Sequence, residues 1–368
     1  MRYYSYFILL SLFFIAACNN TRREPEHYGR KTAEWYIKLL DSIEIKDDSV
    51  SWNGSYFSSS GILGFLDGET SSLSFYDWDN GELLFRDLDK GHARNELPGW
   101  SVATAIDSSD SIVIYADNFL YFYDVSQRKL ISEGFVNFGY TQNDKEKDFE
   151  SSRSYKLCSI NIYPIDSETL LFPLAYNSEN IEGWYENSHI WGLYNYKERK
   201  FTKLSGHIPS YYKQHPVPLF ERFVSYKVGS GYVTTHVLDS LLYFYTDIDN
   251  ISHSFGYEIG NANRKYTCKE NDMYDAMTAV KDENKISLNQ SLYYSKNMNV
   301  LIRTVVTNKG EGCITTIQVY NLENYDLTTE YQYHGQIDIM YSNKNILYGV
   351  NLNPDDKNYI YRFAVNKR

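Results

Sequence analysis

The sequence has few of the residues, and none of the motifs, from which common catalytic sites are built. Histidine occurs only 8 times in 368 residues, and no HExxH segment or other zinc-ligand spacing is present. A GxSxG nucleophile motif, a phosphate-binding loop and a GxGxxG segment after a strand are also missing. His207 and His215 flank one loop, but side chains in such a loop are more often solvated than bound to a metal. We therefore expect no catalytic residue, no metal site and no cofactor.

Cysteine is equally scarce, with 4 copies, and none shows CxxC spacing. Cys158 and Cys313 lie in strand-like runs, where a cysteine usually packs as a small apolar side chain. If Cys18 is set aside, the three remaining cysteines leave at least one unpaired. We expect no structural disulfide.

Positive charge is in deficit, since 36 Lys and Arg residues face 47 Asp and Glu residues and give a formal net charge of -11. Phosphate binding needs a basic surface that releases counterions. The composition therefore excludes a nucleic-acid partner. Modest negative charge is itself a common means of remaining soluble and indicates no particular ligand.

Tyrosine is abundant, with 36 copies, and aromatic residues make up 17% of the chain. Aromatic side chains favour β-strands, where they pack on a half-buried pleated surface. They also serve as flat platforms for sugars. Composition alone does not separate the two interpretations.

The N-terminus begins with one positive residue, Arg2, and continues as a nearly uninterrupted apolar run from Phe7 to Ile15. This run is too short for a permanent membrane span, which needs about 20 residues, and it is typical of a signal peptide. It ends in Ile15-Ala16-Ala17-Cys18, which resembles the bacterial lipobox. The resemblance implies that residues 1–17 are a cleaved signal peptide and that Cys18 is lipidated, which would anchor the chain to a membrane.

The residues after the anchor are polar and have no apolar period, so we predict a lipidated, flexible tether over 18–34 and a folded domain over 35–368. Asn19 to Arg23 contains no acidic run of the kind that directs some lipoproteins to the cell surface. We expect attachment to the cell membrane or the outer membrane, facing the periplasm, with surface display as the alternative.

One pattern recurs along the chain: an apolar-x-apolar-aromatic stretch, usually followed by Asp or Asn, a polar turn and a second strand. The copies are Leu73–Asp77, Leu120–Asp124, Trp191–Asn195, Leu242–Thr246, Ile317–Asn321 and Ile360–Ala364. Another apolar run precedes several of them. Repeat units of about 40 to 50 residues in length match the blades of a β-propeller. We therefore predict an all-β, six-bladed β-propeller.

The sixth copy ends close to Arg368, with no room for the partner strand that the other copies have. Ile43–Lys46 is strand-like and has no hairpin partner of its own. We therefore predict a ring closed by an N-terminal strand in the last blade, with Ile43–Lys46 beside Ile360–Val365. Such closure removes two exposed sheet edges.

With these features the chain resembles the TolB-like six-bladed β-propeller lipoproteins of bacteria, a family of unknown function. The resemblance covers about Ser42 to Lys367 and depends on blade count, hairpin pattern and lipobox. It implies a fold and a location, and it carries over no catalytic residue.

The candidate ligand-binding surface lies in an insertion between two strands. Trp184 and Tyr185 are placed there for stacking, and Glu186 and Asn187 for binding hydroxyls or amides. The alternative is that the two rings cap the apolar edge of a blade.

Two functions fit the sequence. The first is a membrane-anchored, non-enzymatic binding or scaffold module for a protein or glycan of the cell envelope. The alternative is a propeller-type enzyme that cleaves glycans or peptides with carboxylates gathered from several blades. Two partly buried carboxylates facing one another at the centre of the ring would favour the enzyme.

Overall fold

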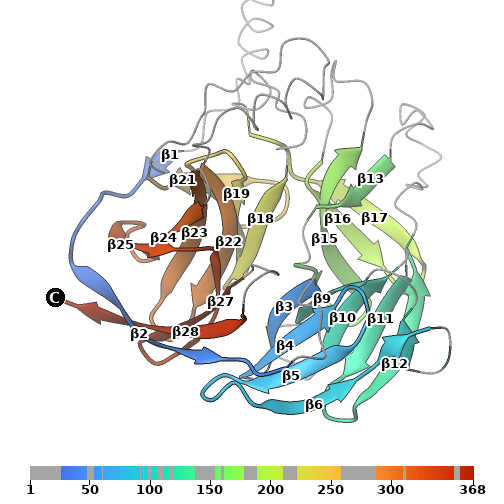
Figure 1. The fold of residues 1–368 in the computed structure, drawn as a ribbon. Helices are drawn as coiled ribbons and strands as arrows, with labels where there is room; N and C mark the ends of the chain where they lie inside the picture. The colour runs from blue at the N-terminus through green and yellow to red at the C-terminus, as the bar shows by residue number, and fades with distance from the viewer. Residues whose placement is uncertain are drawn as a thin grey trace, which may run out of the picture.

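The structure is a computed structural model that describes residues 26–47, 54–59, 61–91, 93, 95–97, 101–105, 111–116, 119–136, 154–158, 161–177, 189–209, 222–257, 287–309, 312–351 and 357–368. Every regular element in these residues is a β-strand. Most strands belong to six sheets that surround a common centre (Figure 1). The predicted six-bladed β-propeller is confirmed.

Blades 1 to 3 follow one another along the chain. Blade 1 comprises β3 (Gly54–Ser59), β4 (Ile62–Asp67), β5 (Leu73–Asp77) and β6 (Leu83–Asp87). Blade 2 comprises β9 (Ser101–Ala105), β10 (Ser111–Ala116), β11 (Phe119–Asp124) and β12 (Lys129–Phe135). Blade 3 comprises β13 (Ser154–Leu157), β14 (Tyr163–Pro164), β15 (Thr169–Asn177), β16 (Trp191–Asn195) and β17 (Lys200–Ser205). A short parallel pair, β7 (Asp89–Lys90) and β8 (Glu96–Leu97), lies between blades 1 and 2 in the sequence.

Blades 4 and 6 each include one strand from the N-terminal part of the chain, and blade 5 includes none. Blade 4 comprises β18 (Phe223–Val228), β19 (Gly231–His236), β20 (Leu242–Tyr245), β21 (Ile251–Phe255) and, in parallel with β21, β1 (Glu26–Tyr28). Blade 5 comprises β22 (Ser287–Ser295), β23 (Val300–Lys309), β24 (Gly312–Asn321) and β25 (Leu327–His334). Blade 6 comprises β26 (Ile337–Asn343), β27 (Ile346–Asn351), β28 (Tyr359–Lys367) and β2 (Trp35–Glu44).

The recurring sequence pattern marks the same position in each blade. Its six copies fall on the third strands, which are β5, β11, β16, β20, β24 and β28. The first strands line the centre, where β22 contacts both β18 and β26, and β3 contacts β26 and β9. Each third strand is therefore buried between its two neighbours within the blade. This explains its largely apolar and aromatic character.

The ring closes where β2 pairs with β28, drawn in blue and red in Figure 1. Ile43 pairs with Ile360, and Ser42 pairs with Tyr361. The closing strand is longer than predicted and lies earlier in the chain, because it starts at Trp35 and ends at Glu44, which leaves Ile45 and Lys46 outside it. Its added length includes Trp35 and Ile37, which are both buried. The predicted closure by an N-terminal strand in the last blade is confirmed.

The part of the predicted tether that the structure describes is paired with the propeller, so its prediction as a flexible segment is wrong there. Glu26–Tyr28 forms β1 beside β21. Thr32 N donates to Leu327 O at 2.8 Å, and Leu327 N donates to Arg30 O at 2.9 Å. We call residues 26–34 the N-terminal strap. Backbone pairing with two blades needs no apolar period, which is why the pattern of the sequence did not reveal it.

The hydrophobic core lies between the blades, where facing sheets pack. Phe75 and Tyr123 stack between blades 1 and 2, with ring centroids 6.3 Å apart. Trp191 of blade 3 packs edge-on against Phe223 of blade 4. Burying one such side chain stabilises the fold by about 1.5–3 kcal/mol. Each blade thus depends on its neighbours for burial, as expected for stacked repeats.

Candidate functional site

The clearest candidate site lies between the innermost strands of blades 5 and 6. Asp338 on β26 accepts a hydrogen bond from Gln290 Nε2 on β22 at 2.7 Å, and one from Thr304 Oγ1 on β23 at 3.3 Å. Ser291 also hydrogen-bonds to the Asp338 carboxylate. We call these four residues the axial cluster. Asp338 and Gln290 are both half-buried.

An irregularity in β22 positions Gln290. The pairing of β22 with β23 shifts between Asn289 and Ser291, so Gln290 is the extra residue of a β-bulge. Asn289 is fixed toward blade 4, because its Nδ2 donates to Thr235 Oγ1 at 3.0 Å and to His236 O at 2.6 Å. Gln290 thereby faces blade 6, where Asp338 lies. The bulge carries two neighbouring amides to opposite sides of one strand.

The electrostatics of the axial cluster are unusual for a surface carboxylate. Burial raises the pKa of Asp338 to about 6, against hydrogen bonds from Ser291, Gln290 and Thr304 that favour the charged form. These hydrogen-bonding neighbours are neutral. Gln290 Oε1 is buried and has no hydrogen-bond partner among the described residues. A carboxylate with a displaced pKa at the centre of a fold is typical of a functional site.

Aromatic rings lie further along the same innermost strands. Tyr293 of β22 contacts Tyr226 of β18 edge-on, with ring centroids 5.6 Å apart. The Tyr293 hydroxyl and Ser342 Oγ of β26 are 3.0 Å apart and hydrogen-bonded. Both tyrosines are half-buried. Rings of this kind combine a stacking face with a polar tip.

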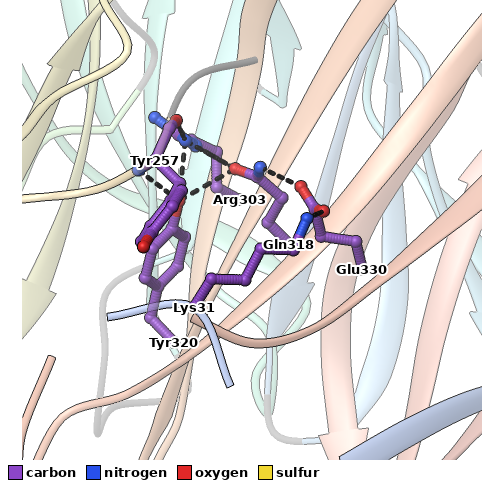
Figure 2. A network of polar contacts seen from close by, with 6 residues as sticks. All are labelled: Lys31, Tyr257, Arg303, Gln318, Tyr320 and Glu330. Carbon is purple, nitrogen blue, oxygen red and sulfur yellow. Dashed lines mark hydrogen bonds and ion pairs between the residues drawn. The ribbon is translucent and has the colours of Figure 1, made fainter. Parts of the chain in front are cut away.

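A second polar group, shown in Figure 2, lies between blades 4 and 5 and centres on Arg303, which is fully buried. Its Nε donates to Gln318 Oε1 at 2.8 Å, and Nη2 donates to the Tyr320 hydroxyl at 2.7 Å. Nη1 donates to Ser240 O and Nη2 to Tyr257 O, each at 2.8 Å. Burial lowers the pKa of Arg303, while Tyr320 and more distant acidic groups oppose the shift.

This network reaches the N-terminal strap through two further residues (Figure 2). Gln318 Nε2 donates to Glu330 Oε1 at 2.6 Å, and Lys31 forms an ion pair with Glu330. Arg303 therefore joins carbonyl oxygens of blade 4 to side chains of blade 5, and Glu330 joins blade 5 to the strap. Carbonyl and amide acceptors, and not a carboxylate, directly surround the guanidinium. This favours a structural role for Arg303.

The carboxylates of the hairpin turns have the structural role that turn chemistry predicts. Asp77 Oδ1 accepts from Asp79 N at 2.8 Å and from Asn80 N at 3.0 Å. Asp247 Oδ1 accepts from Asp249 N at 2.8 Å in the equivalent turn of blade 4. These side chains hold backbone turns.

The predicted ligand-binding residues Trp184, Tyr185, Glu186 and Asn187 lie outside the described residues, as does the predicted lipidation site Cys18. Their predicted roles stay predictions. Trp184 to Asn187 lie within residues 178–188, which connect β15 to β16, the second and third strands of blade 3.

His215, which with His207 flanks one loop, also lies outside the described residues. The structure instead brings His189 next to His207, with ring centroids 5.2 Å apart. Among the residues that the structure describes, no group of three or more His, Cys, Asp or Glu side chains is arranged to hold a metal ion. In the same part of the chain, no helix is long and apolar enough to cross a membrane.

Sequence reasoning missed the axial cluster and the Arg303 network. A signal existed for both, since Asp338 and Arg303 interrupt the apolar stretches Ile337–Ile339 and Leu301–Val306. A charge within a buried strand needs partners. On the described innermost strands Asp338 is the only Asp or Glu, so the facing pair of carboxylates that would favour the enzyme is not assembled there.

Comparison with known proteins shows similarity of fold alone. No family model matches the sequence, and no curated protein is detectably similar. The chain is similar in structure to a member of the DUF4221 family from Bacteroides vulgatus, with a TM-score of 0.64 and 15% identity over 92% of this chain and 100% of that one. It is also similar to a Bacteroides fragilis protein named "Putative exported protein", with a TM-score of 0.54 and 12% identity over 93% of this chain and 99% of that one.

These similarities support the fold over nearly the whole length of both neighbours. Membership of the TolB-like lipoproteins and lipid anchoring both stay predictions from the sequence.

Proposed function

We propose that this chain is an exported, lipid-anchored propeller that acts as a non-enzymatic binding module for a protein or glycan in the cell envelope. The observation that carries the proposal is the axial cluster, in which the Asp338 carboxylate is retained near the centre of the ring among neutral partners. Burying a charge costs free energy unless it is paired. A ligand that donates hydrogen bonds or carries a positive charge would supply the missing partner.

The chemistry of the neighbouring groups narrows the ligand class. The Asp338 carboxylate is an acceptor, so it suits the hydroxyl groups of a glycan or the amide and ammonium groups of a peptide. Tyr226 and Tyr293 add ring faces on adjacent innermost strands. Aromatic faces beside a few placed polar groups are the usual composition of a small-ligand site. The Trp184–Asn187 segment would extend this surface outward.

The test has two independent parts. Metabolic labelling with a fatty-acid probe should label the wild-type chain, and Cys18→Ser should abolish the label. The purified lipoprotein should then bind defined glycans or envelope peptides on an array, and Asp338→Asn should weaken that binding at least tenfold. Glu323→Gln removes the same charge from an exposed turn of blade 5 and should leave binding unchanged. Equal binding by wild type and Asp338→Asn would remove the axial cluster from the proposal.

A further inference from the structure

The N-terminal strap runs along the outer edges of blades 4 and 5 and leads into the outer strand of blade 6. β1 adds to the outer edge of β21 in blade 4, and residues 30–32 pair with Leu327 at the start of β25, the outer strand of blade 5. The chain then becomes β2, the outer strand of blade 6. β1, β25 and β2 are the edge strands of their sheets. Toward the N-terminus, the described chain therefore ends at the outer edge of blade 4.

Close contacts fix the strap to this rim. Arg30 N donates to Asp326 Oδ1 at 2.6 Å, and Lys31 forms an ion pair with Glu330. Gly29 has a φ of +98°, and a Cβ at this position would lie 2.3 Å from Tyr325 O. Only glycine lets the backbone pass so near that carbonyl group. The strap is thus a specific attachment, held by backbone, side chain and conformation together.

The distance from the strap to the predicted anchor is short. Glu26 lies eight residue steps after Cys18 in the sequence, and a fully extended chain of eight steps spans about 27 Å. A domain of about 330 residues has a radius of gyration of about 20 Å, and therefore a diameter of about 50 Å. The segment between the predicted anchor at Cys18 and the start of β1 is therefore shorter than the diameter of the domain.

We propose that the rim of blades 4 and 5 faces the membrane and that the rim of blades 1 and 2 points away from it. The proposal depends on the proposed lipidation of Cys18. Blade 1 lies opposite blade 4 in a ring of six, so an orientation with the outer strand of blade 1 directed at the bilayer would hold the strap about 50 Å away, beyond its reach of about 27 Å.

The proposed orientation determines which exposed apolar side chains of blades 1 and 2 face away from the membrane. Leu83 and Leu84 on β6 and Ile131 on β12 are exposed, at 43%, 48% and 48%. They belong to the outer strands of blades 1 and 2. In the proposed orientation these side chains are presented to the aqueous compartment and not to lipid.

Energy transfer from the protein to a labelled bilayer tests the orientation. A dye is attached through a bio-orthogonal amino acid at Gln332 on β25 or at Leu84 on β6, both exposed. The lipidated full-length protein is then reconstituted in vesicles with acceptor-labelled lipids. Transfer should be at least threefold more efficient from Gln332 than from Leu84. Equal transfer from the two sites, or stronger transfer from Leu84, would overturn the proposal.

Two controls separate the outcomes. Fatty-acid labelling is measured on the same samples, because loss of the label contradicts lipidation, whereas a labelled protein with the reversed transfer pattern contradicts the orientation alone. Gly29→Val forces a side chain into the Tyr325 carbonyl group and should release the strap. It should at least halve the ratio of transfer between the two sites, while the lipid label stays unchanged. An unchanged ratio would show that the strap does not set the orientation.

Discussion

Ile43 of β2 pairs with Ile360 of β28, so one joint between the two ends of the described chain closes the ring. Ile360 is fully buried and packs in the cluster between blades 6 and 1. Ile360 thus takes part both in the strand pairing that closes the ring and in the hydrophobic core between two blades. Damage to this joint should therefore affect the whole propeller and not blade 6 alone.

We expect Ile360→Ala to lower the free energy of unfolding by about 2–5 kcal/mol, because it leaves a cavity between two blades. Chemical denaturation followed by tryptophan fluorescence measures the change. Lys38→Ala, on the exposed side of β2, is the matched control and should stay within about 0.5 kcal/mol of wild type. A shift as large for Lys38→Ala would show that β2 tolerates no substitution, irrespective of core packing.

The hydrogen bonds of Arg303 predict that even a substitution that keeps its charge lowers the stability of the protein. Arg303→Lys keeps the charge but loses the fork that reaches Gln318, Ser240 and Tyr257 together. We expect it to destabilise the protein by about 2–4 kcal/mol, since buried acceptors lose their donors. The midpoint of thermal unfolding reports the effect. Exposed Arg199, which lies in a turn of blade 3, offers the control substitution Arg199→Lys, for which no change is expected.

The raised pKa of Asp338 predicts a specific dependence of stability on pH. The group binds its proton more tightly when folded, with a pKa of about 6, than when unfolded, near 3.8. The folded state therefore holds more protons between these values, and stability from this group falls as pH rises from about 4 to 6. Above pH 6 the full penalty of the buried charge is present.

Asp338→Asn removes this penalty, so its melting temperature relative to wild type should rise between pH 4 and pH 7. Thermal unfolding at four pH values measures the difference. Glu323→Gln should show no such trend. A difference that stays constant across this range would contradict the raised pKa.

The predicted ligand surface is tested by Trp184→Ala and Tyr185→Ala. If these rings bind a ligand, both variants should bind at least tenfold more weakly on the same array, while the midpoint of thermal unfolding moves by no more than about 1 °C. A fall of several degrees would identify the rings as part of the core. Exposed Tyr36 on β2 provides the control Tyr36→Ala, which should change neither property.

Local patterns predicted the blades well because the third strand of each unit is buried on both sides. Leu73–Asp77 and Trp191–Asn195 were located to the residue, as β5 and β16. The strap escaped prediction because Glu26–Tyr28 and Lys31 attach through backbone groups and one ion pair, which leave no periodic trace. The axial cluster escaped because Gln290 and Asp338 meet only through a bulge and a contact between separate blades.

The sequence by itself determined the number of repeats and the need for a strand from the other end of the chain, and it predicted a signal for export and lipid attachment. Those features depend on residues close together along the chain, whose alternation, length and order can be read directly. Tertiary structure alone decided which side chains meet at the centre of the ring and where the N-terminal strap lies on its rim. Such meetings join positions up to hundreds of residues apart, and only the packing of complete blades brings them within hydrogen-bonding distance.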